Sequence, residues 1–326
     1  MLSRAAFRLG ARPVRVLDGG MGVLLPKLGM PEDPLLWSAR ALVQEDLNPL
    51  VVKAHRAFIE AGATAIIANS YAVIPGYLRK RGLEREARRL AALAGRLARE
   101  AAGGPAEEGE GVLVFGSLPP LMDSYRADLM LPREEAEDWY AMMAEAMAPF
   151  TDAFLCETMS CPEEALCALR GLERSCPDSK AWVAFSVTSE GRCRDGTAFN
   201  EAVMTLAGLP SVAGIGVNCC VPEAVELAAS SLEADEEAAE FASGLERVVY
   251  ANAYPKEMNE DQAFDVEMFD HEAVRGDVCR RSYAEWAVRW ATRPNLPFTT
   301  IGGCCGIFPE HIHSMAVALD SALGSE

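Results

Sequence analysis

The stretch Leu-Pro-Phe-Thr-Thr-Ile-Gly-Gly-Cys-Cys-Gly occupies residues 296–306, where an apolar run ends in two adjacent cysteines between glycines. Adjacent cysteines do not readily bridge each other, because a disulfide needs Cα atoms further apart than neighbours normally allow. The flanking glycines let the backbone bend so that both sulfurs point to one place. Cys304 and Cys305 therefore indicate either two ligands for a soft cation, most often zinc, or two packed thiols in a tight turn.

The apolar run before these cysteines is the last of eight that alternate with helical segments. The runs span residues 14–17, 63–68, 112–115, 153–156, 181–185, 213–217, 248–251 and 298–301. Eight strands alternating with helices are typical of a (β/α)8 TIM barrel. A doubly wound sheet is the alternative, but no Gly-rich nucleotide fingerprint follows the first run. We therefore predict a single α/β barrel over residues 14–326.

Two local patterns predict helix details. The acidic, alanine-rich stretch 223–242 is predicted to be helical. Ser160 and Glu163 have the spacing of a capping box for the helix that follows the fourth run.

Composition excludes several classes of partner. The chain has 48 acidic and 30 basic residues and a net charge of −18, which argues against binding nucleic acid or anionic lipid. No apolar run reaches the length of a membrane span, so we expect a soluble protein. The ten cysteines show no small-scaffold spacing and follow no signal-peptide hydrophobic region, which favours a reducing compartment, the cytoplasm. The oligomeric state is not encoded in any readable pattern.

Residues 1–13 carry three arginines, a serine and no acid, and so resemble the end of an organelle transit peptide. A plain N-terminal tail is the interpretation we favour. An organellar location is the alternative if these residues belong to a transit peptide.

In a barrel, the C-terminal ends of the strands line one mouth, and the chemistry takes place there. The residues predicted at these ends are mostly polar: Asp18, Asn69, Ser70, Tyr71, Ser117, Glu157, Ser186, Cys219, Asn252, Cys304 and Cys305. Three of them are cysteines, and three thiolates with a fourth position left open are typical of a catalytic zinc site. We expect the other seven cysteines to be packed side chains.

A zinc ion held by three thiolates is electron-rich and activates water poorly. It is suited to binding an incoming thiol, lowering the pKa of that thiol and leaving a nucleophilic sulfur. The predicted site therefore indicates alkyl transfer onto sulfur.

Three stretches carry a specific resemblance: Asp-Gly-Gly at 18–20, Gly-Val-Asn-Cys at 216–219 and Gly-Gly-Cys-Cys at 302–305. They resemble the signature motifs of the zinc-dependent homocysteine S-methyltransferase family, which includes betaine–homocysteine methyltransferase. The resemblance extends from Val14 to Ala322 and is strongest to the stand-alone enzymes that use S-methylmethionine or S-adenosylmethionine.

The resemblance implies a role for each matching residue. Cys219, Cys304 and Cys305 are expected to ligate one zinc ion, with Cys219 favoured over its neighbour by the Asn-Cys register. Asp18 and Glu157 are expected to bind the ammonium group of homocysteine, a task suited to paired carboxylates.

Five further residues are implied in substrate binding. The backbone N–H groups around Gly19 and Gly20 are expected to receive the homocysteine carboxylate. Trp37 and Tyr71 match aromatic positions near the methyl donor, where aromatic faces suit a sulfonium cation; core packing is the alternative for both. Asn218, inside the second motif, is also assigned to substrate binding.

The implied activity is methyl transfer from a sulfonium donor to homocysteine, giving methionine. Thr158 stands where betaine-using relatives carry a tyrosine, which disfavours betaine as the donor. One alternative is the same chemistry on selenocysteine or another thiol or selenol. Another is a zinc-binding or thiol-redox barrel without catalysis.

Overall fold

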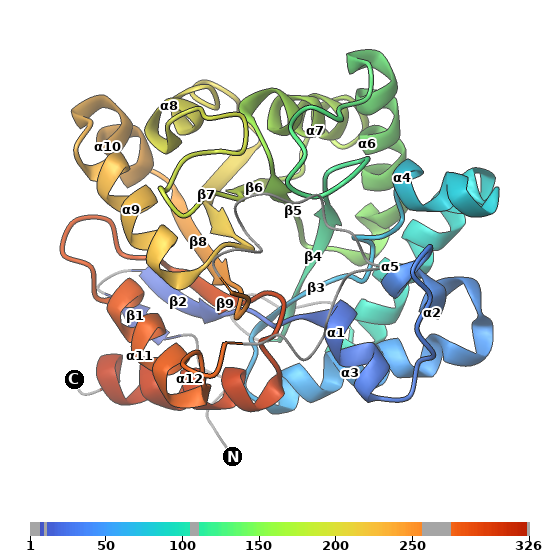
Figure 1. Ribbon diagram of the computed structural model, residues 1–326, viewed down its shortest axis with the longest axis horizontal. Helices are drawn as coiled ribbons and strands as arrows, with labels where there is room; N and C mark the ends of the chain where they lie inside the picture. Colours follow the sequence, from blue (N-terminus) through green and yellow to red (C-terminus); the bar gives the residue numbers. More distant parts are fainter. Residues whose placement is uncertain (1–6, 10–11, 105–110, 256–274, 325–326) are drawn as a thin grey trace.

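Eight parallel strands surrounded by helices form the body of the molecule (Figure 1). The structure is a computed structural model that describes residues 7–9, 12–104, 111–255 and 275–324. The strands are β1 (Phe7–Leu9), β2 (Arg12–Val16), β3 (Ala65–Ile67), β4 (Leu113–Leu118), β5 (Ala153–Met159), β6 (Ala181–Phe185), β7 (Val212–Asn218), β8 (Glu246–Ala251) and β9 (Thr300–Gly303). The helices are α1 (Met21–Lys27), α2 (Arg40–Val43), α3 (Asn48–Glu60), α4 (Pro75–Leu78), α5 (Ala87–Ala102), α6 (Arg133–Met147), α7 (Pro162–Ser175), α8 (Phe199–Met204), α9 (Pro222–Glu233), α10 (Glu236–Ser243), α11 (Arg280–Ala291) and α12 (Pro309–Leu323).

The strands pair in the order β1-β2-β9-β8-β7-β6-β5-β4-β3, and every pair except β1–β2 is parallel. The two ends of the parallel series meet through a bridge between Leu17 and Ala65. The Thr64 N–H also donates to the Val16 carbonyl over 2.8 Å. The sheet is thus closed into a barrel, which confirms the predicted TIM-barrel fold.

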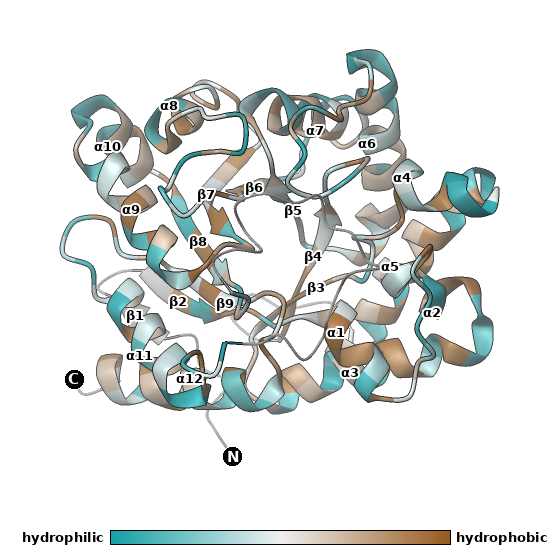
Figure 2. Ribbon diagram, viewed as in Figure 1, coloured by the Kyte–Doolittle hydropathy of each residue, from teal (hydrophilic) through white to brown (hydrophobic). Residues whose placement is uncertain are grey.

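Alternation along each strand divides the core into two parts. On β8, Val248 and Tyr250 point into the barrel, where they join Leu17, Phe115 and other interior side chains. Val249 and Ala251 point outward and join the large cluster beneath the helices. Figure 2 shows hydrophobic residues along β7 and β8 and hydrophilic ones on the outer turns of α10. The barrel interior and the helix–strand layer are therefore both apolar, and polar groups gather at the strand ends.

The prediction that residues 223–242 are helical is confirmed. They form two helices, α9 and α10, because the Asp235 carboxylate accepts the Ala238 N–H and starts a new helix. One helix prediction was wrong. The capping box at Ser160 is absent, since Cys161 is the N-cap of α7. The Glu164 carboxylate, and not that of Glu163, accepts the Ser160 N–H over 2.7 Å.

The boundary predicted at residue 14 differs slightly from the structure, because β2 already begins at Arg12. Most of the predicted tail, residues 1–6 and 10–11, lies outside the described residues. Within the described part of the chain, no helix combines the length and apolar character that a membrane crossing requires.

Candidate active site

Strand β8 brings together three cysteines that lie far apart in the sequence. It pairs with β7 on one side and β9 on the other, with Asn218 opposite Tyr250 and Gly303 opposite Ala251. The Cys219 N–H then donates to the Tyr250 carbonyl over 3.0 Å, and the Cys304 N–H donates to the Ala251 carbonyl over 2.8 Å. Two neighbouring carbonyls of one strand therefore set the spacing of the cysteines.

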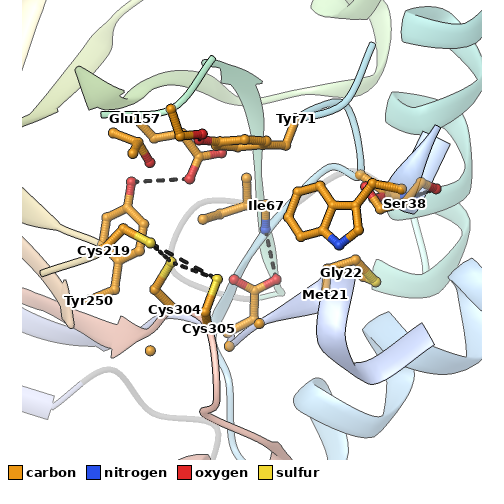
Figure 3. Close-up of a pocket in the computed structure, with 18 of the residues that line it drawn as sticks. Met21, Gly22, Ser38, Ile67, Tyr71, Glu157, Cys219, Tyr250, Cys304 and Cys305 are labelled. Carbon is orange, nitrogen blue, oxygen red and sulfur yellow. Dashed lines mark hydrogen bonds between the residues drawn. The ribbon is translucent and has the colours of Figure 1, made fainter. Parts of the chain in front are cut away.

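The three sulfurs form a compact triangle at the mouth of the barrel (Figure 3). Cys305 Sγ lies 4.0 Å from Cys219 Sγ and 3.9 Å from Cys304 Sγ. Sulfurs of a tetrahedral zinc site lie about 3.8 Å apart, as Zn–S bonds of about 2.3 Å require. The third edge, between Cys219 and Cys304, is 2.9 Å, shorter than this value but longer than a disulfide bond. The triangle fits a thiophilic metal ion, and among the described residues this is the group with suitable ligand spacing.

The three sulfurs favour a single thiolate, at Cys219. Hydrogen bonds from the Cys304 and Cys305 thiols hold the pKa of Cys219 well below its usual value. The pKa of Cys304 is raised, because it donates to Cys219 and is itself buried. The site thus stabilises one thiolate, whereas ionising the other two thiols is unfavourable. A bound divalent cation would offset the repulsion between the three thiolates.

A cavity that is open to solvent lies above the sulfurs. Its lining includes Asp18, Gly19, Gly20, Trp37, Tyr71, Glu157, Cys219, Cys304 and Cys305. Nine of the ten residues predicted for the site thus share one cavity. The exception is Asn218, which lies behind the wall.

Two carboxylates face this cavity. Asp18 Oδ2 accepts the Ile67 N–H over 3.0 Å, whereas the buried Oδ1 has no partner among the described residues. Glu157 accepts hydrogen bonds from Ser117 and, over 3.4 Å, from the Tyr250 hydroxyl. Burial raises the pKa of Asp18 well above its usual value and the pKa of Glu157 to about 7. Both groups are suited to a cationic ligand, which would offset the cost of their burial.

Trp37 and Tyr71 form an aromatic corner of the cavity. Their ring centroids lie 5.6 Å apart with the ring planes at 84°. The Tyr71 hydroxyl lies 2.6 Å from Ser124 Oγ. A methyl group added at Gly22 would lie 2.1 Å from the Trp37 ring, so the indole rests directly on the backbone of α1.

Backbone strain is concentrated at the cavity. Four described residues other than glycine have positive φ, namely Trp37 (45°), Tyr125 (67°), Thr158 (58°) and Cys219 (48°). All four line the cavity. Such conformations cost about 1–3 kcal/mol each and persist where surrounding contacts fix them, most often at functional sites.

Comparison with known proteins agrees with this geometry. The sequence profile of the homocysteine S-methyltransferases matches residues 15–319. The chain belongs to the homocysteine S-methyltransferase family. The resemblance found in the three motifs is thereby confirmed.

Relatives within this family match over nearly their whole length. The homocysteine S-methyltransferase of Escherichia coli K12 is 30% identical, with 94% of this chain and 96% of that protein aligned. The homocysteine S-methyltransferase YbgG of Bacillus subtilis is 27% identical, with 94% and 95% aligned. The crystal structure of the metallated form of the homocysteine methyltransferase MmuM from E. coli superposes with a TM-score of 0.71 at 26% identity, covering 93% of this chain and 96% of that one.

Two residues predicted for substrate binding have hydrogen-bond partners within the chain. The Asn218 side chain accepts the Thr158 N–H over 2.7 Å and donates to Thr158 Oγ1 over 2.8 Å, so it fixes a strained residue. The Gly20 N–H donates to the Ile307 carbonyl over 3.0 Å and is not free for a substrate carboxylate. Glycine is needed at residue 20 because a Cβ there would lie 2.8 Å from the Cys304 carbonyl oxygen.

Most of the other cysteines are packed, as predicted. Cys220 is fully buried in the outer core and points away from the cavity cluster. Cys279, by contrast, is exposed, so the packing prediction was wrong there.

Two tyrosines of the site were missed. Tyr250 lies inside β8, and the alternation of that strand already points it into the barrel. Tyr125 lies in the loop after β4, and its hydroxyl is 2.9 Å from Cys219 Sγ. No sequence pattern locates a loop side chain of this kind.

Proposed function

We propose that this protein transfers a methyl group from a sulfonium donor, S-methylmethionine or S-adenosylmethionine, to the thiol of L-homocysteine, giving methionine. One observation carries the proposal: a single cavity combines three clustered thiols with two buried carboxylates. A protein that only stores metal needs the thiols but not the carboxylates. A site that binds an amino acid through its ammonium group and brings the thiol of that amino acid to the metal needs both the thiols and the carboxylates. Membership of the family supports the same activity.

The amino-acid end of homocysteine is assigned to the carboxylates. Asp18 Oδ1 is a buried acceptor; burial raises the pKa of Asp18, and the nearby charge of Glu157 raises it further. An ammonium group between them would replace this repulsion with two charge-assisted hydrogen bonds. Gly19, whose N–H remains after Gly20 is excluded, is the backbone donor assigned to the substrate carboxylate.

We assign one zinc ion to Cys219, Cys304 and Cys305. When bound, zinc with three thiolate ligands lowers the pKa of a thiol in its fourth position and leaves that sulfur nucleophilic. The three thiols suit a soft or borderline cation and not a hard one such as magnesium. The metallated crystal form of MmuM supports a metal in a relative of the same fold.

The methyl donor is assigned to the aromatic corner. Faces of Trp37 and Tyr71 attract a sulfonium cation through their ring quadrupoles. The homocysteine sulfur attacks the methyl carbon in line, after its proton has passed to solvent. The bond from that carbon to the donor sulfur breaks with its electron pair, so the donor leaves as a neutral thioether. Since the leaving group needs no proton, the protein contributes mainly by positioning.

The sequence around Glu157 also disfavours betaine. Thr158 is a short side chain held at a φ of 58° by Asn218. It is not the tyrosine that betaine-using relatives carry at this position.

We also propose a reducing compartment, with the cytoplasm favoured. All ten cysteines are free thiols, and three of them lie within 4.0 Å of one another without forming a disulfide. Cell fractionation with the native N-terminus would distinguish the cytoplasm from an organelle.

A donor panel tests the activity. Purified zinc-loaded protein is incubated with L-homocysteine and, separately, S-methylmethionine, S-adenosylmethionine, betaine or a dimethylsulfonio compound, and methionine is measured. We expect turnover with a sulfonium amino acid and none with betaine. Selenocysteine in place of homocysteine tests the acceptor. Absence of product with every donor would exclude the proposed activity.

A further inference from the structure

The phenol of Tyr125 contacts one corner of the sulfur triangle. Its hydroxyl lies 2.9 Å from Cys219 Sγ, and its ring packs against the cluster of Cys219, Cys305 and Tyr254. Tyr125 comes from the loop between β4 and α6, whereas Cys219 follows β7. The contact therefore joins two separate βα loops.

The chemistry of the pair fixes the direction of this hydrogen bond. A metal-bound cysteine is a thiolate and has no proton to donate. A phenol donates readily and is neutral at physiological pH. Tyr125 is therefore the donor and Cys219 Sγ the acceptor when the cluster holds a metal.

A second side chain holds the Tyr125 ring in place. The Arg194 guanidinium carbon lies 4.5 Å from the centre of that ring. Arg194 Nη2 also donates to Ser186 Oγ over 2.9 Å, and Ser186 Oγ donates to the Cys219 carbonyl over 3.3 Å. Cys219 is thus held at its sulfur by a phenol and at its carbonyl by a hydroxyl, with one arginine contacting both.

The backbone at both ends of the contact is strained. Tyr125 has a φ of 67° and Cys219 a φ of 48°. Each conformation costs about 1–3 kcal/mol in a residue other than glycine. A tyrosine that served only to fill space would not require a strained loop to place its hydroxyl on a sulfur.

We propose that Tyr125 is a positioning residue that donates a hydrogen bond to the Cys219 thiolate and limits the charge this sulfur gives to the metal. The inference rests on the proposed metal site. A thiolate that gives less charge leaves the metal more electrophilic, so a substrate thiol bound there ionises at lower pH. Arg194, by its positive charge on the ring face, makes the phenol a stronger donor.

The deciding experiment replaces zinc with cobalt(II), whose thiolate-to-metal charge-transfer band reports the electron donation of sulfur. In Tyr125→Phe we expect this band to move to longer wavelength, because Cys219 loses a hydrogen bond and becomes a better electron donor. We expect zinc affinity, measured by chelator competition, to fall about tenfold to a hundredfold, as is usual when an outer-shell partner is lost. The ring remains, so the fold is retained.

Tyr140→Phe is the matched control. Tyr140 is also buried, and its hydroxyl donates to the Pro119 carbonyl over 2.9 Å, away from the sulfurs. This variant loses a comparable hydrogen bond and should leave the cobalt band and zinc affinity unchanged.

Arg194→Met tests whether the contact of Arg194 with the Tyr125 ring strengthens the hydrogen bond to Cys219. We expect a smaller band shift in the same direction, and no additional shift when the change is combined with Tyr125→Phe. A cobalt band at the wild-type position in Tyr125→Phe overturns the inference. Failure of the wild-type protein to bind any metal would instead overturn the proposed function, so the two failures are distinct.

Discussion

Asp18 and Glu157 face the same cavity, where burial raises the pKa of Asp18 and the negative charge of Glu157 raises it further. Within the described part of the chain neither carboxylate has an ion-pair partner, although both are buried. Burying two like charges without a cation lowers the free energy of unfolding, so the site destabilises the protein in the absence of its substrate.

Glu157→Gln should stabilise the substrate-free protein above neutral pH. The pKa of this carboxyl rises from its usual 4.5 to about 7 on folding, so its ionised form opposes folding fully above pH 7. The shift corresponds to about 3 kcal/mol at pH 8, and the gain should shrink as pH falls towards 4.5. Thermal unfolding at pH 8 and pH 6 measures it. Glu163→Gln, an exposed partner of Arg133, should change stability by less than about 0.5 kcal/mol.

Amino-acid binding should weaken as the pH falls. Near pH 7 Glu157 is half protonated, and a protonated carboxyl does not attract an ammonium group. We expect the affinity for methionine, which carries the ammonium group but no thiol, to fall about tenfold between pH 8 and pH 6. Calorimetry should also detect proton release on binding at pH 6. A flat affinity over this range would argue against Glu157 as the ammonium ligand.

Gly22→Ala should impair use of the methyl donor. The added methyl would lie 2.1 Å from the Trp37 ring, which must then move out of the aromatic corner. We expect the donor KM to rise at least tenfold, with homocysteine KM and zinc content near wild type. Gly276→Ala, where a methyl group meets open space, is the control. An unchanged donor KM would mean that Trp37 packs the wall and does not contact the donor.

The periodicity of the sequence is sufficient to predict the barrel and the clustering of the three cysteines. The eight apolar runs correspond to the eight strands of the barrel. Because the C-terminal ends of barrel strands line one mouth, Cys219 is predicted to lie near Cys304 and Cys305, on the two strands that flank β8. This works because strand order in a TIM barrel follows sequence order. Residues directly after strands are therefore placed by topology alone.

Contacts that depend on loop conformation or on a single helix-capping side chain cannot be predicted in this way. Tyr125 reaches Cys219 only because its loop folds back with a φ of 67°, which no periodic pattern specifies. The break between α9 and α10 depends on one side chain, Asp235, competing as a helix cap within a stretch of high helix propensity. The occupied Gly20 N–H depends on the position of Ile307, a tertiary contact.

The most direct measurement determines metal content and methionine formation in the same preparations of wild type, Cys219→Ala and Cys220→Ala. Wild type should contain one zinc per chain and convert homocysteine and S-methylmethionine to methionine. Cys219→Ala should lose both metal and activity, because two thiols remain of the three that the site requires. Cys220→Ala, altered in the outer core, should keep both. Methyl transfer at the wild-type rate by metal-free Cys219→Ala protein would contradict the account.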